Sequence, residues 1–254
     1  MTIAVDSIVS SPMPMPRRQH LIFDADDTLW ENNRYFETAF SDFVTFLNHE
    51  HLGHQDIRDV LDAFQKDNRH HLGYGSRSFA TSLRHTFQHV KNVESNDPIL
   101  DEAQQFGLRI LDLEMEPIPG VEETLTLLQP HHDLILLTKG DSEEQRAKID
   151  RSGIEHFFDD TIVVTEKTAT TYHETVAAKQ LNPLDTWMIG NSPRSDINPA
   201  LNAGINAVFI PHELTWHLEI EEISTLAEHR PGTLLQLVYF RELLAHFGES
   251  STSN

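Results

Sequence analysis

The sequence predicts an α/β fold in which a parallel, doubly wound sheet carries an inserted all-helical segment. Two observations support this prediction. Five short apolar runs, each the length of a buried strand, alternate with segments of helical periodicity. Between the first run and the second, four amphipathic stretches follow one another with no strand pattern among them. The first observation predicts the sheet, and the second predicts a separate helical domain.

The chain divides into four parts on this pattern. Residues 1–18 lack the basic start and apolar core of a signal peptide, and we expect a disordered leader there. The sheet domain takes residues 19–30 and 117–247, the helical domain takes residues 31–116, and residues 248–254 form a flexible tail. Expected strands cover 21–23, 133–137, 161–164, 186–190 and 207–210, and expected core helices end at 128 and cover 142–152, 197–203 and 234–247.

The helical domain is indicated by four apolar stripes. Each stripe places apolar side chains three or four residues apart, which puts them on one face of a helix. Such stripes are more typical of core packing than of a cofactor site. The stripes are Phe36, Phe40, Phe43 and Leu47; Ile57, Val60, Leu61 and Phe64; Phe79, Leu83, Phe87 and Val90; and Phe106, Ile110 and Leu113.

The composition disfavours several classes of partner. Lys and Arg total 19 against 40 Asp and Glu, giving a formal net charge of −21, which argues against nucleic acid and anionic membrane surfaces. No apolar run approaches the roughly 20 residues of a membrane span. The absence of cysteine fits a cytoplasmic location. The sixteen histidines are scattered, and we expect the pairs His70-His71 and His131-His132 on the surface of a monomer or homodimer.

Three carboxylates follow the first apolar run, in the stretch HLIFDADDTLW from His20 to Trp30. Ligands of open α/β sheets bind beyond the carboxyl ends of the strands, so this is where an active site belongs. Residues alternate sides along an extended strand tip, so Asp24 and Asp26 point roughly the same way. Two such carboxylates repel unless a cation or a shared proton lies between them. An Asp cluster that caps the next helix is the alternative.

FDADDT resembles the first motif of the haloacid dehalogenase superfamily of phosphotransferases, D-x-D-x-T/V after an apolar strand. The resemblance implies a Rossmann-like core, with the inserted helices acting as a cap over the active site. It also implies that Asp24 is the nucleophile that forms an aspartyl-phosphate and that Asp26 is the general acid/base. A carboxylate can take a phosphoryl group covalently and so divide one difficult step into two.

Two further motifs follow in the superfamily's order. Thr138 ends the second apolar run and matches the hydroxyl that binds the transferring phosphoryl group, with Lys139 adjacent as a further positive charge. Lys167 follows the third run and resembles the ammonium that pairs with the nucleophile and the phosphate. The usual Pro after this Lys is absent, because Thr168 follows it. A surface lysine at a helix start is the alternative for Lys167.

The fourth motif departs from the family pattern. The family has Gly-Asp and a second Asp a few residues on, whereas here Asn191 follows Gly190 and Asp196 comes later. The resemblance implies a Mg²⁺ site formed by Asp24, the Asp26 main-chain oxygen, Asn191 and Asp196. An Asn carbonyl oxygen can bind a hard cation but brings no charge. We therefore expect a working site with weakened metal affinity.

One segment of the helical domain breaks the periodic pattern, the run from His71 to Arg77 with Gly73 and Gly75 on either side of Tyr74. Two glycines give a flexible turn. The functional interpretation is a substrate-binding loop, in which Tyr74 or Arg77 grips the leaving group. An ordinary connection between two helices is the alternative.

The resemblance implies a Mg²⁺-dependent phosphomonoester hydrolase that acts on a small phosphorylated metabolite. In the same superfamily, 2-haloacid dehalogenases lack the second Asp of the first motif, so Asp26 argues against dehalogenation. A nucleoside 5′-monophosphatase and a sugar-phosphate mutase remain open as alternatives. A phospho-ligand-binding regulatory protein is the alternative from another class, and Asn191 motivates it.

Overall fold

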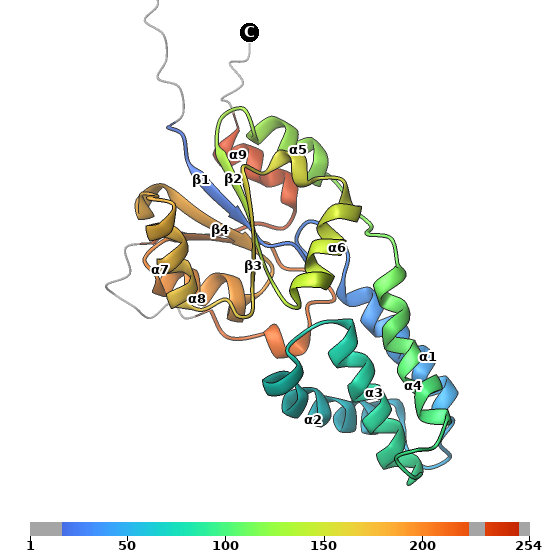
Figure 1. Ribbon diagram of the computed structural model, residues 1–254. Coiled ribbons are helices and arrows are strands. Elements are labelled where there is room, and N and C mark those ends of the chain that lie inside the picture. The colour runs from blue at the N-terminus through green and yellow to red at the C-terminus, as the bar shows by residue number, and fades with distance from the viewer. Residues whose placement is uncertain (1–16, 224–231, 249–254) are drawn as a thin grey trace, which may run out of the picture.

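The computed structural model describes residues 17–223 and 232–248, and within them it confirms the α/β fold (Figure 1). Six parallel strands form one sheet in the order β3-β2-β1-β4-β5-β6. The strands are β1 (His20–Phe23), β2 (Asp133–Lys139), β3 (Asp160–Val164), β4 (Thr186–Gly190), β5 (Asn206–Phe209) and β6 (Leu234–Gln236). Because β2 and β4 flank β1, the strand order reverses there, and the crevice typical of doubly wound sheets opens at its carboxyl end.

Both faces of the sheet are covered, which explains why the strands are continuous apolar runs. Leu21 and Phe23 of β1 face one cluster, and Ile22 faces another. The first cluster contains side chains of α5 (Val121–Leu128), α6 (Ser142–Ser152) and α9 (Leu243–Phe247). The second contains side chains of α7 (Ala169–Ala178) and α8 (Asn198–Asn202). Figure 1 shows these two sets of helices on opposite sides of the sheet.

Two expected core helices are corrected. The segment 234–247 is not one helix: it forms β6, a 3-10 helix at Phe240–Glu242 and only then α9. Leu234 and Leu235 pack against different clusters, as strand residues do, but three residues are too few to show a period of two. The segment 197–203 begins earlier than expected, as a π-helical turn at Pro193–Ile197 that continues into α8.

Four helices lie beyond the carboxyl end of β1, and we call them the cap helices: α1 (Asn33–Leu47), α2 (His54–Leu72), α3 (Ser76–Lys91) and α4 (Ile99–Leu108). They surround a hydrophobic cluster of their own, in which Phe40, Leu61 and Leu83 are fully buried. The fourth predicted stripe, which runs to Leu113, extends past the end of α4. A 3-10 helix follows α4 at Arg109–Asp112, and Leu113 is 38% exposed.

The chain leaves the sheet for the cap helices and returns to it along paired segments. Glu31 N–H donates to the Glu116 carbonyl (2.8 Å), and Ile118 N–H donates to the Leu29 carbonyl (3.0 Å). Of the expected leader, residues 1–16 lie outside the described residues, whereas Arg18 pairs with Asp133. Of the expected tail, residues 249–254 also lie outside them. Within the described ranges, no helix is both long and apolar enough to cross a bilayer.

His132 is buried, contrary to the surface position expected for the pair His131-His132. Its Nδ1 accepts the Gln19 N–H (3.1 Å), and its Nε2 lies 2.7 Å from the Phe247 carbonyl, so it joins the starts of β1 and β2 to the end of α9. Burial lowers the pKa of His132, although the contact with the Phe247 carbonyl opposes this.

We expect His132 to make the fold sensitive to acid. A lowered pKa means that the unfolded chain takes up the proton first, so this stabilisation is present above the unfolded pKa of about 6.5 and is lost as the pH falls below it. Urea unfolding at pH 7.5 and pH 5.5 should show a smaller difference for His132→Gln than for the parent. An equal difference in the two proteins would show that His132 has no part in it.

Candidate active site

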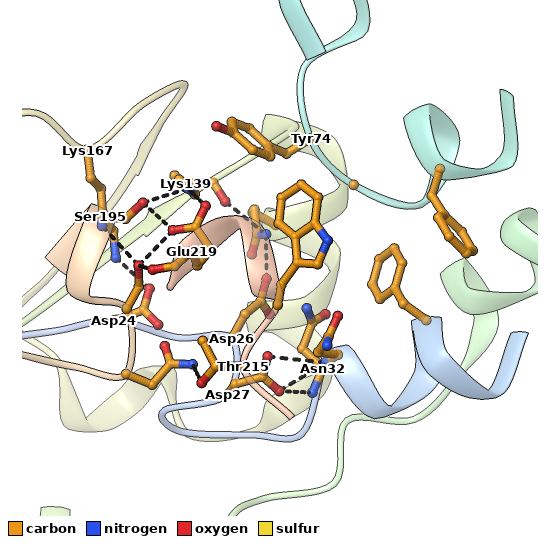
Figure 2. Close-up of a pocket in the computed structure, with 18 of the residues that line it drawn as sticks. Asp24, Asp26, Asp27, Asn32, Tyr74, Lys139, Lys167, Ser195, Thr215 and Glu219 are labelled. Atoms are coloured by element: carbon orange, nitrogen blue, oxygen red, sulfur yellow. Dashed lines mark hydrogen bonds and ion pairs between the residues drawn. The ribbon is translucent and has the colours of Figure 1, made fainter. Parts of the chain in front are cut away.

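A cavity lies where the carboxyl end of the sheet faces the cap helices (Figure 2). It brings together most of the residues predicted from the motifs, although these are spread over more than 170 positions of the sequence. From the core it is lined by Asp24, Asp26, Asp27, Lys139, Gln145, Lys148, Lys167, Asn191, Ser192, Ser195 and Asp196, and from the segment after β5 by Thr215, Trp216 and Glu219. Thr138 and Arg77 are not among the lining residues.

Asp24 follows the central strand directly and is buried, with 7% of its surface exposed. Its Oδ1 accepts a hydrogen bond from Lys167 Nζ (2.5 Å), and its Oδ2 accepts one from Thr28 Oγ1 (3.0 Å). Burial and the nearby Asp196 raise the pKa of Asp24 to about 7, although Lys167 opposes this. The first-motif carboxylate is thus fixed in direction by two donors.

Lys167 is buried between two carboxylates. Its Nζ donates to Asp24 Oδ1 and to Asp196 Oδ1 (2.8 Å). Burial would lower the pKa of Lys167, but the two carboxylates raise it to about 12, so the side chain stays charged. The missing Pro is replaced by an N-cap, because Thr168 Oγ1 accepts the Thr171 N–H at the start of α7 (3.2 Å). The alternative of a surface lysine is wrong.

Asp26 is held by three side chains. Trp30 Nε1 donates to its Oδ1 (2.8 Å), Gln145 Nε2 to its Oδ2 (2.9 Å), and Lys148 Nζ to both oxygens (3.1 and 2.9 Å). Burial alone would raise the pKa of Asp26, but the charge of Lys148 and these hydrogen bonds lower it below its usual value. Asp26 is therefore a carboxylate in this arrangement.

Gln145 and Lys148 were missed from the sequence, because the charged stretch 142–152 has a composition typical of a solvated helix face. Both side chains are buried, together with Glu144 on the same helix. Their spacing could have indicated a shared helix face: Lys148 lies three residues after Gln145 and four after Glu144, on the helix that follows the second motif.

Asp27 bears out the alternative of a helix cap. Its Oδ1 accepts the N–H groups of Asn32 and Asn33 at the start of α1 (2.9 Å each). Burial raises the pKa of Asp27 to about 6, although these hydrogen bonds oppose this. Together with Glu31 and His212 it also forms a group of potential metal ligands at the side of the site.

The arrangement of the predicted Mg²⁺ ligands fits a metal site in part. The Thr28 hydroxyl lies 3.0 Å from Asp24 Oδ2 and 3.4 Å from Asn191 Oδ1, so these two oxygens face a common point. Asn191 Nδ2 donates to Thr215 Oγ1 (3.2 Å), which turns its carbonyl oxygen toward Asp24. Asp196, however, uses its Oδ1 for Lys167 and its Oδ2 for the Ser192 N–H (2.9 Å). Direct ligation by Asp196 remains a prediction.

Thr138 and Lys139, at the end of β2, differ in their surroundings. Thr138 is buried, and its hydroxyl lies 3.3 Å from Gln145 Oε1. Lys139 Nζ lines the cavity and binds Glu219 Oε1 and Ser195 Oγ, both at 2.6 Å. Glu219 was not expected from the sequence, since it ends a short 3-10 helix, His217–Glu219, with no motif around it.

The loop between α2 and α3 reaches the core. Tyr74 O–H donates to Glu166 (2.7 Å), and the Tyr74 ring lies 4.4 Å from Lys139 Nζ (Figure 2). Gly75 has φ of 109°, and a Cβ there would lie 2.5 Å from a Glu144 carboxylate oxygen, so only glycine fits. Arg77 is exposed, so the structure does not bring it together with the other predicted residues.

The cavity carries an excess of negative charge. Six carboxylates and four cationic side chains are among the described residues that line it. Lys139, Lys148, Lys167 and Arg58 are each paired with a carboxylate. A phosphate dianion would meet net repulsion here, which a divalent cation would offset.

Comparison with known proteins agrees with this geometry. Residues 19–204 match the family of haloacid dehalogenase-like hydrolases, and the chain belongs to this family. The protein is therefore a hydrolase with an α/β core. In sequence, it is 23% identical to the human N-acylneuraminate-9-phosphatase over 77% of this chain and 83% of that protein.

Two further relatives extend the comparison. The glyceraldehyde 3-phosphate phosphatase of Methanothermobacter thermautotrophicus is 30% identical over 45% of this chain and 58% of that protein. In structure, a haloacid dehalogenase-like family hydrolase from Xanthomonas campestris superposes with a TM-score of 0.71 and 31% identity, over 78% of this chain and 86% of that one.

Proposed function

We propose that this protein is a Mg²⁺-dependent phosphomonoesterase that acts on a small phosphorylated metabolite through a phosphoryl group carried by Asp24. The observation that carries the proposal is the fixed Asp24 carboxylate, with its oxygens directed by Lys167 and Thr28 at the carboxyl end of the central strand. The relatives named as phosphatases support the same reaction.

The chain's own residues account for both steps. Asp26, which is a carboxylate in the free protein, takes up a proton as the substrate binds. An Asp24 oxygen attacks phosphorus, the bond from phosphorus to the ester oxygen breaks, and the leaving oxygen takes this proton from Asp26. Asp26 then takes a proton from water, which attacks phosphorus and breaks the bond to Asp24, releasing inorganic phosphate. Asp26 thereby holds the proton that the next turnover uses. Lys167 stabilises charge on the transferring group.

Asp24 and Asn191 would hold the Mg²⁺ ion, whose charge offsets that of the phosphate. Asp196 belongs to the proposal as a ligand through water, because Lys167 and Ser192 occupy its oxygens. Lys139, at the end of β2, and Tyr74, in the loop between α2 and α3, belong to it as substrate-binding residues. We also propose a cytoplasmic location and a monomer or homodimer.

We expect release of inorganic phosphate from an aryl phosphate with Mg²⁺, and loss of that release with EDTA. Phosphate that moves between positions of a sugar phosphate without release would instead indicate the mutase. If no phosphate is released even at high Mg²⁺, the assay is repeated with Asn191→Asp, which supplies the missing negative charge. The attraction between the added carboxylate charge and Mg²⁺ is worth more than about 1.4 kcal/mol at close range, and 1.4 kcal/mol is a factor of ten in binding. We therefore expect Asn191→Asp to tighten Mg²⁺ binding at least about tenfold. If Asn191→Asp binds phosphate esters but releases no phosphate from them, the result would support the alternative of a phospho-ligand-binding regulatory protein.

A further inference from the structure

The part of the cavity beyond the phosphate site is bounded by aromatic rings. Phe36 and Phe79 of the cap helices pack edge to face with ring centroids 5.1 Å apart. Tyr74 and Trp216 do the same across the boundary between cap helices and core, at 6.2 Å. Rings of this kind favour a flat, weakly polar ligand group over a hydrated one.

We call this part of the cavity the cap side; it is lined by Phe36, Glu37, Arg58, Gln65, Tyr74 and Phe79. It offers no free positive charge among the described residues that line it. Its one cation, Arg58, donates to Glu37 Oε2 (2.5 Å). The guanidinium also lies 3.6 Å from the centroid of the buried Phe40 ring, so one of its faces is covered. An anionic leaving group would lose its hydration here and gain no partner.

One polar atom on the cap side does lack a partner. Gln65 Oε1 is buried, it belongs to a residue that lines the cavity, and it has no hydrogen-bond partner among the described residues. A buried carbonyl oxygen without a donor is costly. A rotation of the half-buried Gln65 side chain would turn this oxygen toward the cavity, where a hydroxyl or amide N–H of a ligand would recover that cost.

We propose that this side of the cavity binds the leaving group, and that the leaving group is an uncharged ring-bearing alcohol with a donor that reaches Gln65. Esters whose leaving group carries a carboxylate are excluded by the pairing of Arg58 with Glu37. The inference rests on the proposed phosphatase function and adds the substrate class to it.

Three esters test the inference: phenyl phosphate, 4-carbamoylphenyl phosphate and 4-carboxyphenyl phosphate. The carbamoyl and carboxyl esters are close in shape but differ in charge. Phenyl phosphate has no hydrogen-bond donor on its ring. We expect kcat/KM for the carbamoyl ester to exceed that for the carboxyl ester by roughly 100-fold, because an unpaired group is strongly rejected. Equal values, or a preference for the carboxyl ester, would overturn the inference.

Two variants assign the effect to residues. Gln65→Leu should lower the ratio of the carbamoyl to the phenyl ester by about tenfold, the effect of one lost hydrogen bond to a buried group, whereas Gln105→Leu on an exposed face of α4 should not. Glu37→Gln frees Arg58 and should raise the ratio of the carboxyl to the carbamoyl ester. Unchanged ratios in both variants would contradict the assignment. If neither the parent nor Asn191→Asp releases phosphate from any of the three esters, the phosphatase function itself is contradicted, and the inference with it.

Discussion

Replacement of Asp24 with Asn is expected to lower kcat for any phosphate ester by roughly 10⁴-fold or more, because the nucleophile is lost and no step can bypass it. The amide keeps the size of the side chain, and its oxygen can still accept the Lys167 hydrogen bond. The measurement is steady-state phosphate release with Mg²⁺, beside Asp67→Asn, which makes the same change at an exposed position of α2.

The same variant separates lost chemistry from lost folding. The pKa of Asp24 is raised to about 7, above its unfolded value, so the carboxyl group lowers the free energy of unfolding as the pH rises through this range, and in full above pH 7. Asp24→Asn should therefore unfold at the same or a higher temperature than the parent at pH 8. An inactive variant that also melts well below the parent would point to misfolding as the cause.

Replacement of Lys167 with Met is expected to have the largest effect on stability. It leaves two buried carboxylates, Asp24 and Asp196, without the ammonium that both of them contact. Removing one partner of a buried ion pair costs about 3–5 kcal/mol. Urea unfolding at pH 7.5 measures the loss, and activity should fall with it because the phosphoryl group loses the same charge.

A second substitution tests whether the stability loss arises from the unpaired charge. In Lys167→Met combined with Asp196→Asn, one unpaired carboxylate is removed, so the double variant should recover part of the loss. Lys66→Met, on an exposed part of α2, controls for the exchange of Lys for Met. Strictly additive losses in the double variant would show that Lys167 and Asp196 are not coupled.

The motifs predicted the core of the site because their physical demands are local. Asp24 and Asn191 each follow a buried strand, and Lys167 follows the half-buried edge strand β3. Parallel strands bring their carboxyl ends to one edge of the sheet. The order of the motifs therefore predicted which residues meet. The position of the usual Pro after Lys167 is taken by Thr168, which caps α7.

What escaped prediction depends on contacts between distant segments. The buried face of α6 is polar because it meets Asp26, so Gln145 and Lys148 looked like solvent-facing residues. Trp216 and Glu219 lie at the two ends of a 3-10 helix that is too short to show a period, although both line the cavity. β6 was taken for helix because a three-residue edge strand leaves too short a pattern.

The most direct test of the account is to trap the phosphorylated side chain. The protein is mixed with an aryl phosphate and Mg²⁺, quenched in acid within one turnover, digested, and analysed by mass spectrometry. The account predicts a phosphoryl group on the peptide containing Asp24, stable in acid, released by hydroxylamine and absent from Asp24→Asn. Phosphate release at the parental rate in Asp24→Asn, or a phosphoryl group on any other residue, would contradict the account.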